Sequence, residues 1–344
     1  MSLPDKIETE EQLEEVLTTP APAVVESLRS IEGDLIVLGV AGKMGPTLAR
    51  LARRALDQAG RQSQVIGVAR FSDPRVRDGL EAGGVRTIAA DLLDPGALAA
   101  LPEVANVVYL AARKFGSTGD EPYTWAMNTY LPALVAERYR RARVVALSTG
   151  NVYPLVPVGR GGPDEDHATG PVGEYAQSCL GRERLFQYFS RRHGTPVALI
   201  RLNYAIDLRY GVLMDIATKV HSGRPVDLAM GHVNVIWQGD ANAAILRSLT
   251  LCASPPFILN LTGPSTLSVR QLAHDFGRRL GKEPVFEGVE QATALLSDAS
   301  RYVRRLGPPA VSLERMIDWV AHWVRIDGRT LNKPTHYESR DGRF

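Results

Sequence analysis

The chain has 344 residues, 44% of them hydrophobic and 23% charged, which is enough for a sizeable core and too long for one minimal domain. Forty Lys and Arg against 38 Asp and Glu leave a formal charge of +2, so no field exists to hold a polyanion and no nucleic-acid partner is expected. The two distant cysteines, Cys179 and Cys252, exclude a disulfide framework, and no run reaches about 18 apolar residues, so we expect a cytoplasmic protein without a membrane partner.

Residues 5–31 carry apolar side chains at helical spacing on both sides of a break at Pro20-Ala21-Pro22. We expect two short helices here and assign residues 1–33 to an N-terminal helical extension. From residue 35, short β-rich apolar runs follow at residues 35–40, 65–69, 87–90, 107–110, 144–147 and 197–202. Helical stretches are expected between them at residues 46–59, 125–140 and 175–193. This alternation predicts an α/β fold with a Rossmann-type, doubly wound parallel sheet.

Three glycines, Gly39, Gly42 and Gly45, follow the first expected strand and precede a helix. The first permits a tight turn, the second lets backbone N–H groups approach a pyrophosphate, and the third allows close packing of helix and strand. A plain strand–turn–helix corner is the alternative interpretation. The strand before, the helix after and the further βα units favour dinucleotide binding.

The end of the second expected strand indicates which dinucleotide is bound. A carboxylate there would hold the ribose hydroxyls of NAD, whereas an arginine suits the 2′-phosphate of NADP. The sequence has Arg70 and Ser72 at this point and no acid before Asp73, with Lys43 in the glycine loop. NADP is therefore preferred over NAD, the alternative being that Arg70 is an ordinary surface residue.

After residue 204 the regular alternation of expected strands and helices ends. Shorter segments follow, separated by proline and glycine. We assign residues 34–204 and about 236–262 to an NAD(P)-binding Rossmann domain. Residues 205–235 and 263–344 are assigned to a smaller substrate-binding region, in which the polar segment 332–344 forms an extended arm.

Further segments follow in a characteristic order. They are Gly39–Gly45, Asp91-Leu92, Leu110-Ala111-Ala112, Asn128, Ser148-Thr149-Gly150 and Tyr175-Ala-Gln-Ser-Cys179. Over most of residues 34–325 the chain resembles the extended short-chain dehydrogenase/reductases, the NAD(P)-dependent epimerase/dehydratase family. The resemblance implies cofactor contacts for Gly39, Gly42, Lys43, Met44, Gly45, Asp91, Leu92, Leu110, Ala111, Ala112 and Tyr175. Asn128 is implied to support the active-site backbone beside the cofactor.

The resemblance also implies the catalytic groups. In this family a tyrosine, here Tyr175, exchanges a proton with the substrate, and a hydroxyl residue, here Thr149, hydrogen-bonds the reacting oxygen. The family's lysine one helical turn later lowers the pKa of the phenol, which is otherwise near 10. This chain has Cys179 at that position, and a cysteine cannot supply a positive charge.

Three interpretations of this substitution stay open. Another cation replaces the lysine: Lys114, implied by resemblance to lie near the cofactor, or Arg182 or Arg184 on the tyrosine helix. Alternatively, hydride transfer proceeds with a weaker proton relay, or the protein binds the cofactor without turnover. Only six of the forty basic residues are lysines, and none lies between positions 115 and 218, so a replacement within that window must be an arginine.

Other candidate sites carry less weight. His167 with the preceding acids 164–166 can be interpreted as a metal site, but a solvated loop is favoured and no metal is expected. A Ser-His-Asp hydrolase would need a nucleophile elbow such as G-x-S-x-G, which is absent from the sequence. Sugar-nucleotide members of the family place a diphosphate-binding arginine where this chain has Val233, which argues for a smaller substrate. Trp237 is interpreted as a buried anchor rather than a sugar-stacking residue.

The predicted function is an NAD(P)-dependent oxidoreductase, epimerase or dehydratase that acts on a small hydroxylated or carbonyl, sugar-like substrate. The alternative is a cofactor-binding sensor or scaffold that has lost turnover through Cys179. By resemblance, a homodimer is expected through the helices at residues 126–136 and 180–189.

Overall fold

The computed structural model describes residues 3–343, so residues 1, 2 and 344 of the assigned extension and arm lie outside the described part. Its centre is a parallel sheet of seven strands in the order β12-β7-β5-β4-β1-β2-β3. The strands are β1 Leu35–Leu38, β2 Val65–Ala69, β3 Arg86–Ala89, β4 Asn106–Tyr109, β5 Arg143–Thr149, β7 Val197–Leu202 and β12 Phe257–Leu261. This order, with β1 between β2 and β4, confirms the predicted Rossmann-type fold.

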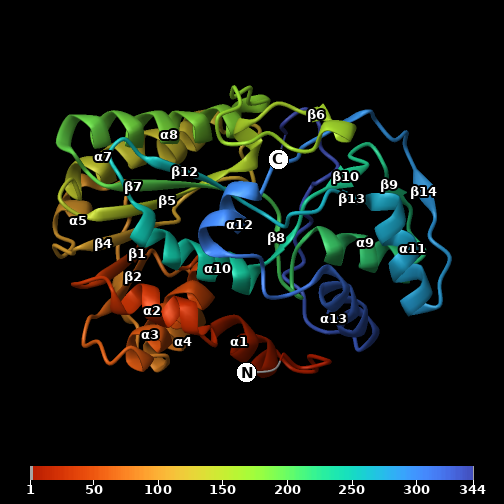
Figure 1. Ribbon diagram of the computed structural model, residues 1–344, viewed down its shortest axis with the longest axis horizontal. Coiled ribbons are helices and arrows are strands. Elements are labelled where there is room, and N and C mark those ends of the chain that lie inside the picture. The colour runs from red at the N-terminus through yellow and green to blue at the C-terminus, as the bar shows by residue number, and fades with distance from the viewer. Residues whose placement is uncertain (1–2, 344) are drawn as a thin grey trace.

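Helices cover both faces of the sheet, as Figure 1 shows. One face packs on α3 (Gly45–Gln58), α4 (Pro74–Ala82), α10 (Gln238–Arg247) and α12 (Ser300–Leu306). The other packs on α5 (Pro95–Ala99), α7 (Leu131–Arg138) and α8 (Gly173–His193). Because both faces are covered, β1 and β2 are buried along their whole length, which explains why their sequences are continuous apolar runs.

The expected helix at residues 125–140 is divided in the structure. Helix α6 (Glu121–Trp125) passes through a π-helical turn, η1 (Ala126–Tyr130), into α7. Pro132 lies in the first turn of α7 and has no backbone N–H to donate to the preceding turn, so a continuous α-helical ladder cannot form there. The prediction of a single helix is therefore wrong in this detail.

A second core lies beside the sheet domain. It is built from α9 (Val212–His221), α11 (Val269–Leu280) and α13 (Leu313–Arg325). Four short strand pairs complete it: β8 (Ala205–Ile206) with β11 (Ile236–Trp237), β9 (Val226–Asp227) with β14 (Phe286–Glu287), β10 (His232–Val233) with β13 (Leu267–Ser268), and β6 (Val156–Pro157) with β15 (Thr293–Ala294). Trp237 is 1% exposed and meets Trp319 edge-on at 5.2 Å between ring centroids, in agreement with an anchoring role.

The two terminal segments are integral to these cores. Helix α1 (Glu10–Thr18) packs Leu13 and Leu17 into the second core, whereas α2 (Pro22–Arg29) packs against the sheet domain. At the other end, residues 328–343 form no helix or strand. Residues 329–343, the C-terminal arm, nevertheless insert Tyr337 into the second core at 1% exposure. Helices α1 and α2 and the C-terminal arm therefore pack against the two cores.

A buried ion pair joins the elements that carry the candidate catalytic residues. Arg201 on β7 and Glu183 on α8 are 3% and 0% exposed, with 2.8 Å between Nη2 and Oε2. Ser148 on β5 donates to Glu183 at 2.6 Å, and Arg201 donates to the Tyr153 hydroxyl at 2.7 Å. These additional hydrogen bonds satisfy the buried charges, which is the condition for such a pair to be tolerated.

Removing one charge of this pair should destabilise the whole domain. Glu183→Gln leaves the Arg201 guanidinium buried without its counter-charge, and we expect a loss of about 3–5 kcal/mol in the free energy of unfolding. Urea unfolding followed by circular dichroism measures the change. Glu26→Gln, which breaks the exposed pair with Arg29, is the matched control and should cost at most about 1 kcal/mol. Equal losses in the two variants would contradict the assigned role of the buried pair.

Candidate active site

The glycine loop forms one wall of a cavity at the carboxyl ends of β1, β2 and β4. We name it the glycine-loop pocket; its volume is about 370 Å³. Its lining includes Gly39, Ala41, Gly42, Ala69, Arg70, Phe71, Ser72, Asp73, Val76, Ala90, Asp91, Leu92, Leu110, Ala111, Ala112 and Met127. Eight of the predicted cofactor residues therefore meet in one place: Gly39, Gly42, Arg70, Asp91, Leu92, Leu110, Ala111 and Ala112.

At two positions of the loop, close contacts with the backbone leave no room for a side chain, so only glycine fits. Gly39 has a φ of +86°, and a Cβ there would lie 2.7 Å from the backbone of Ala111. A Cβ at Gly45 would lie 2.1 Å from the carbonyl oxygen of Val40, so α3 can approach β1 only because this residue is glycine. Gly45 thus acts in packing and is not part of the pocket lining.

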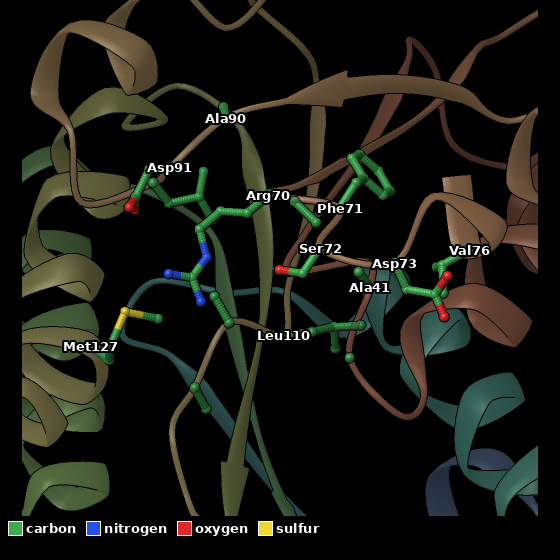
Figure 2. A pocket seen from close by; sticks show the side chains of 16 residues that line it. Ala41, Arg70, Phe71, Ser72, Asp73, Val76, Ala90, Asp91, Leu110 and Met127 are labelled. Carbon is green, nitrogen blue, oxygen red and sulfur yellow. The ribbon is translucent and has the colours of Figure 1, made fainter. Parts of the chain in front are cut away.

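The charged side chains at the end of β2 differ in their availability. Asp73 accepts from the backbone N–H of Arg75 at 3.0 Å, capping α4, and also pairs with the Arg75 guanidinium at 2.8 Å. Arg70 is exposed, and Figure 2 shows its guanidinium within the pocket, between Met127 and Ser72 in that view. The acid at the end of β2 is therefore occupied, and the arginine is presented to the pocket.

A second cavity, which we name the tyrosine pocket, contains the predicted catalytic groups. It has a volume of about 160 Å³. Its lining includes Lys43, Met44, Lys114, Thr149, Asn151, Tyr175, Leu202, Asn203, Tyr204, Ala205, Tyr210, Gly211, Val212 and Thr335. The strand-five threonine, the tyrosine of α8 and two lysines thus share one small space.

The environment of Tyr175 keeps its phenol protonated. Burial raises the pKa of Tyr175 above its ordinary value, and the neighbouring Cys179 raises it further. The Arg182 charge and a hydrogen bond with Thr149 act in the opposite direction but do not offset burial. The Tyr175 phenol therefore carries its proton at neutral pH.

Cys179 lies beneath the tyrosine pocket instead of lining it. Its side chain is fully buried, and burial raises the pKa of the thiol despite the neighbouring Arg182. The Arg182 guanidinium donates to the Cys179 sulfur at 3.7 Å, the Asn128 carbonyl oxygen at 3.0 Å and the backbone oxygen of Leu147 at 2.7 Å. A buried cation therefore lies next to the position of the family's lysine.

Asn128 is part of this support and is absent from both pocket linings. Its side chain lies on the π-helical turn and exchanges hydrogen bonds with the backbone N–H and C=O of Arg113, each at 2.8 Å. Its Nδ2 also donates to Ser178 at 3.0 Å. The wider turn thus places Asn128 between the loop after β4 and α8, which explains why this segment departs from α-helix.

Two lysines approach the tyrosine pocket from different elements. Lys114, after β4, places Nζ 6.0 Å from the Tyr175 ring centroid and 3.4 Å from the Thr335 carbonyl oxygen. Lys43 donates to the Ala205 carbonyl at 2.8 Å and lies 4.2 Å from the Tyr210 ring centroid. Burial lowers the pKa of each lysine to about 8.

The remaining sequence candidates are not brought to either pocket. Arg184 contacts Gln187 and Thr169 on the exposed side of α8. Val233 is fully buried in the second core. The acidic loop 164–166 pairs with Arg301, and within residues 3–343 the structure gathers no group of three His, Cys, Asp or Glu residues suited to a metal. No helix in this range is long and apolar enough to cross a bilayer.

Several pocket residues were not found from the sequence. Asn203, Tyr204 and Tyr210 follow β7, and Thr335 belongs to the C-terminal arm. Asn203 and Tyr204 directly follow a buried strand, which was the available signal. No local pattern marks Thr335, because it reaches the pocket only through the path of the arm across the protein.

The sheet order and the glycine-loop geometry define a Rossmann-type α/β protein with a pocket at the carboxyl edge of its sheet. The chain belongs to the NAD dependent epimerase/dehydratase family, whose model matches residues 35–230. The resemblance proposed from the sequence is thereby confirmed. A comparison with curated protein sequences found no match.

Solved structures share the fold along nearly their whole length. UDP-glucose 4-epimerase from Thermotoga maritima, solved with UDP-glucose, is 20% identical with a TM-score of 0.69, covering 85% of this chain and 98% of that one. UDP-glucose 4-epimerase from Thermus thermophilus, solved with NAD, is 19% identical with a TM-score of 0.70, covering 85% and 99%. UDP-glucuronic acid 4-epimerase from Bacillus cereus, solved with NAD, is 17% identical with a TM-score of 0.69, covering 85% and 98%.

The buried lysines should make stability depend on pH in a predictable direction. An unfolded lysine titrates near about 10.4, so above about pH 8 the folded state holds fewer protons on Lys114 than the unfolded state does. Stability from this group therefore rises with pH between about pH 8 and pH 9.5. We expect wild type to gain free energy of unfolding relative to Lys114→Met over that range, measured by urea unfolding. Lys282→Met, at an exposed site, is the control, and a constant difference between wild type and Lys114→Met would refute the assignment.

Proposed function

We propose that the protein is an NAD(P)-dependent oxidoreductase or epimerase that acts at a secondary alcohol or carbonyl carbon of a small, sugar-like substrate. The observation that carries this proposal is the convergence of Tyr175, Thr149 and Lys114 on one cavity, beside a glycine-loop pocket of the size a nucleotide needs. The glycine loop fits a dinucleotide, because its close contacts leave the backbone free of side chains where a pyrophosphate would approach.

The residues have distinct roles in the proposed mechanism. A bound nicotinamide cofactor supplies hydride chemistry. Tyr175, protonated at neutral pH, donates a proton to the oxygen of a carbonyl substrate, and Thr149 hydrogen-bonds that oxygen. In the reverse direction Tyr175 takes the proton back. Lys114 and Arg182 together provide the positive charge that the family's single lysine otherwise provides.

The size of the tyrosine pocket supports a small reacting group. About 160 Å³ is below the roughly 300–1,000 Å³ that drug-sized ligands occupy. The C-terminal arm forms part of the wall through Thr335, and Val233 is buried where it can offer no phosphate contact. A smaller substrate than a nucleotide sugar therefore agrees with the cavity.

Substituting the tyrosine should remove most of the activity. In a single-turnover assay of bound cofactor with a panel of sugars, sugar acids and their keto forms, Tyr175→Phe should lose roughly 100- to 10,000-fold, the usual contribution of a general acid. Thr149→Val should also lower the rate, whereas Tyr188→Phe, on the exposed side of the same helix, should leave it unchanged. Turnover that survives both pocket substitutions would contradict the site. Cofactor binding without turnover by wild type would favour a sensor or scaffold.

NADP is proposed as the preferred cofactor on account of Arg70. The acid that would hold NAD ribose hydroxyls, Asp73, is committed to Arg75, whereas Arg70 faces the pocket. The related structures are described with NAD, so support for the proposed preference comes from Arg70 and Asp73 of this chain alone.

The preference can be measured by titrating the full-length protein with NADPH and NADH. Wild type should bind NADPH more tightly, and Arg70→Ala should weaken NADPH about tenfold or more, the value of one charged hydrogen bond, with little change for NADH. Arg77→Ala is the matched control, because Arg77 is also exposed, is paired with Glu81 and does not line the pocket. Tighter binding of NADH by wild type would overturn the proposal.

A homodimer is also proposed. Helices α6 and α8 and the π-helical turn lie side by side and expose three large aromatic side chains: Trp125 at 36%, Tyr130 at 54% and Tyr188 at 54%. Aromatic side chains on one face of adjacent helices are typical of an interface that buries them against a second copy.

A further inference from the structure

A third cavity lies next to the tyrosine pocket, and no role follows for it from the glycine loop or the catalytic residues. We name it the outer cavity; its volume of about 380 Å³ is close to the 370 Å³ of the glycine-loop pocket. Helix α9 supplies one wall with Asp215 and Lys219, and the C-terminal arm supplies the other with Lys333 and Glu338. The wall of the outer cavity that the C-terminal arm forms therefore lies outside residues 35–230, which the family model matches.

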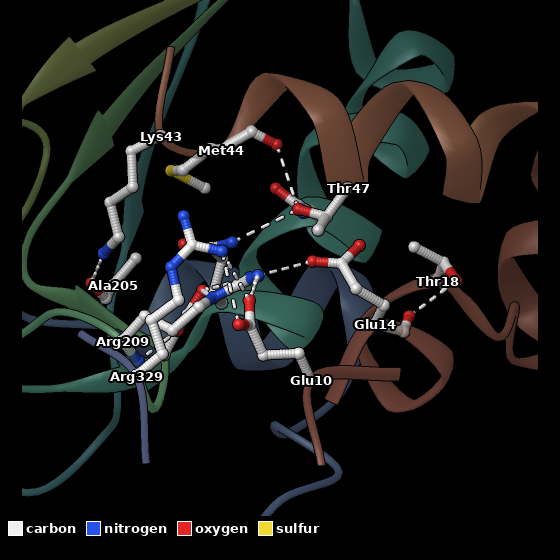
Figure 3. A network of polar contacts seen from close by, with 12 residues as sticks. Glu10, Glu14, Thr18, Lys43, Met44, Thr47, Ala205, Arg209 and Arg329 are labelled. Atoms are coloured by element: carbon white, nitrogen blue, oxygen red, sulfur yellow. Dashed lines mark hydrogen bonds and ion pairs between the residues drawn. The ribbon is translucent and has the colours of Figure 1, made fainter. Parts of the chain in front are cut away.

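The outer cavity is rich in positive charge. Four basic side chains line it: Arg209, Lys219, Arg224 and Lys333. The Arg209 guanidinium is neutralised by Asp207 at 2.8 Å and by Glu14 of helix α1 at 2.7 Å. Figure 3 shows this network, in which Arg209 and Arg329 meet the carboxylates of α1. Arg209 thus serves as a structural tie between the N-terminal helix and the cavity wall.

The three other cations are available to a ligand. Within residues 3–343, Lys219, Arg224 and Lys333 form no salt bridge, and Arg224 donates only to the Ser222 hydroxyl at 3.0 Å. Asp215, one of the two acids of the lining, interacts electrostatically with Lys219. Asp215 accepts two hydrogen bonds from Thr335, at 2.8 and 2.5 Å.

Glu338, the second acid, interacts electrostatically with Lys114 at the edge of the tyrosine pocket. Arg209 being neutralised, the remaining charged side chains of the lining are the cations Lys219, Arg224 and Lys333 and the two acids. The side of the outer cavity formed by Lys219, Arg224 and Lys333 is left with an excess of positive charge, which favours an anionic ligand.

The cavity wall is held in place before any ligand binds. Leu331 of the arm donates to the Arg209 carbonyl at 2.9 Å, and Tyr337 is buried in the second core. Arg340 donates to the carbonyl oxygens of Ala229 at 3.0 Å and Thr293 at 2.7 Å. Such anchoring lowers the cost of ordering the arm when a ligand binds.

The outer cavity and the tyrosine pocket share a wall. Tyr210 lines both, and Thr335 lines the tyrosine pocket while its neighbour Pro334 lines the outer cavity. Lys43, 4.2 Å from the Tyr210 ring centroid, supports this partition from the catalytic side. The two cavities therefore lie against each other, on either side of Tyr210 and the arm at Pro334 and Thr335.

We propose that the outer cavity binds an anionic group, a carboxylate or a phosphate monoester, on the substrate whose reacting carbon enters the tyrosine pocket. This inference rests on the proposed function and narrows its substrate class to sugar acids or sugar phosphates. Lys219 and Arg224 contact the anion as specificity-determining residues, and Lys333 of the arm closes the site over it.

The test is a calorimetric titration of the full-length protein with glucose 6-phosphate, glucuronate and glucose. At least one anion should bind about tenfold or more tightly than neutral glucose, and its binding should weaken as salt is raised. Tighter binding of glucose 6-phosphate identifies a phosphate monoester as the recognised group, and tighter binding of glucuronate identifies a carboxylate. Equal affinity for glucose and both anions would overturn the proposal.

Substitutions in the outer cavity test whether the anion binds there. The double variant Lys219→Gln with Arg224→Gln should lose about tenfold or more in affinity for the anion, whereas Lys282→Gln, an exposed lysine at the end of α11, should not change it. Both substitutions in the double variant lie on the partly exposed wall of the cavity, so a folded protein is expected, and circular dichroism checks it. Unchanged anion affinity in the folded double variant would refute the assigned site.

The titration also separates this inference from the proposed reaction. Anion binding requires neither cofactor nor turnover, so Tyr175→Phe should retain it. Where turnover is measured, the double variant should raise KM for the anionic substrate and leave kcat within about twofold, because its residues hold a group remote from the reacting carbon. A fall in kcat with KM unchanged would contradict anion binding in the outer cavity.

Discussion

The buried pair of Glu183 and Arg201 fixes the relative positions of α8, β5 and β7, on which the candidate site depends. Thr149 is the last residue of β5 and Tyr175 lies near the start of α8, so their meeting requires these two elements to keep one register. A charge pair inside a low-dielectric core tolerates little displacement, because each charge then loses its compensation. The same pair extends through Tyr153 to Asn260 on β12, which links the site to the edge of the sheet.

The absence of the family's lysine changes how charge is distributed around the tyrosine. Cys179 is too small and too deeply buried to reach the pocket, and the space beside it is occupied by the Arg182 guanidinium. Lys114 approaches from the opposite side, on the loop after β4. The Arg182 charge lowers the pKa of the Tyr175 phenol, but burial raises it more, so the phenol stays protonated.

The terminal segments pack beside the cavities at the carboxyl edge of the sheet. Helix α1 fixes Arg209 through Glu14, and the arm passes from Arg329, paired with Glu10, to Thr335 beside the tyrosine pocket. Neither segment lies within the residues matched by the family model. The arm therefore supplies walls of two cavities, whereas helix α1 acts through its ion pair with Arg209.

The sequence by itself determined the sheet, the glycine loop and the order of the catalytic segments, because apolar periodicity, glycine spacing and strand–helix alternation are local properties of the chain. It also located the missing charge at Cys179. Tertiary structure alone decided which cations lie near Tyr175, since Lys114 and Arg182 are separated in sequence and approach it through the packing of a loop and a helix. It likewise decided that the polar C-terminal arm lines a cavity, because contacts such as Thr335 with Asp215 join residues far apart in the chain and leave no local pattern.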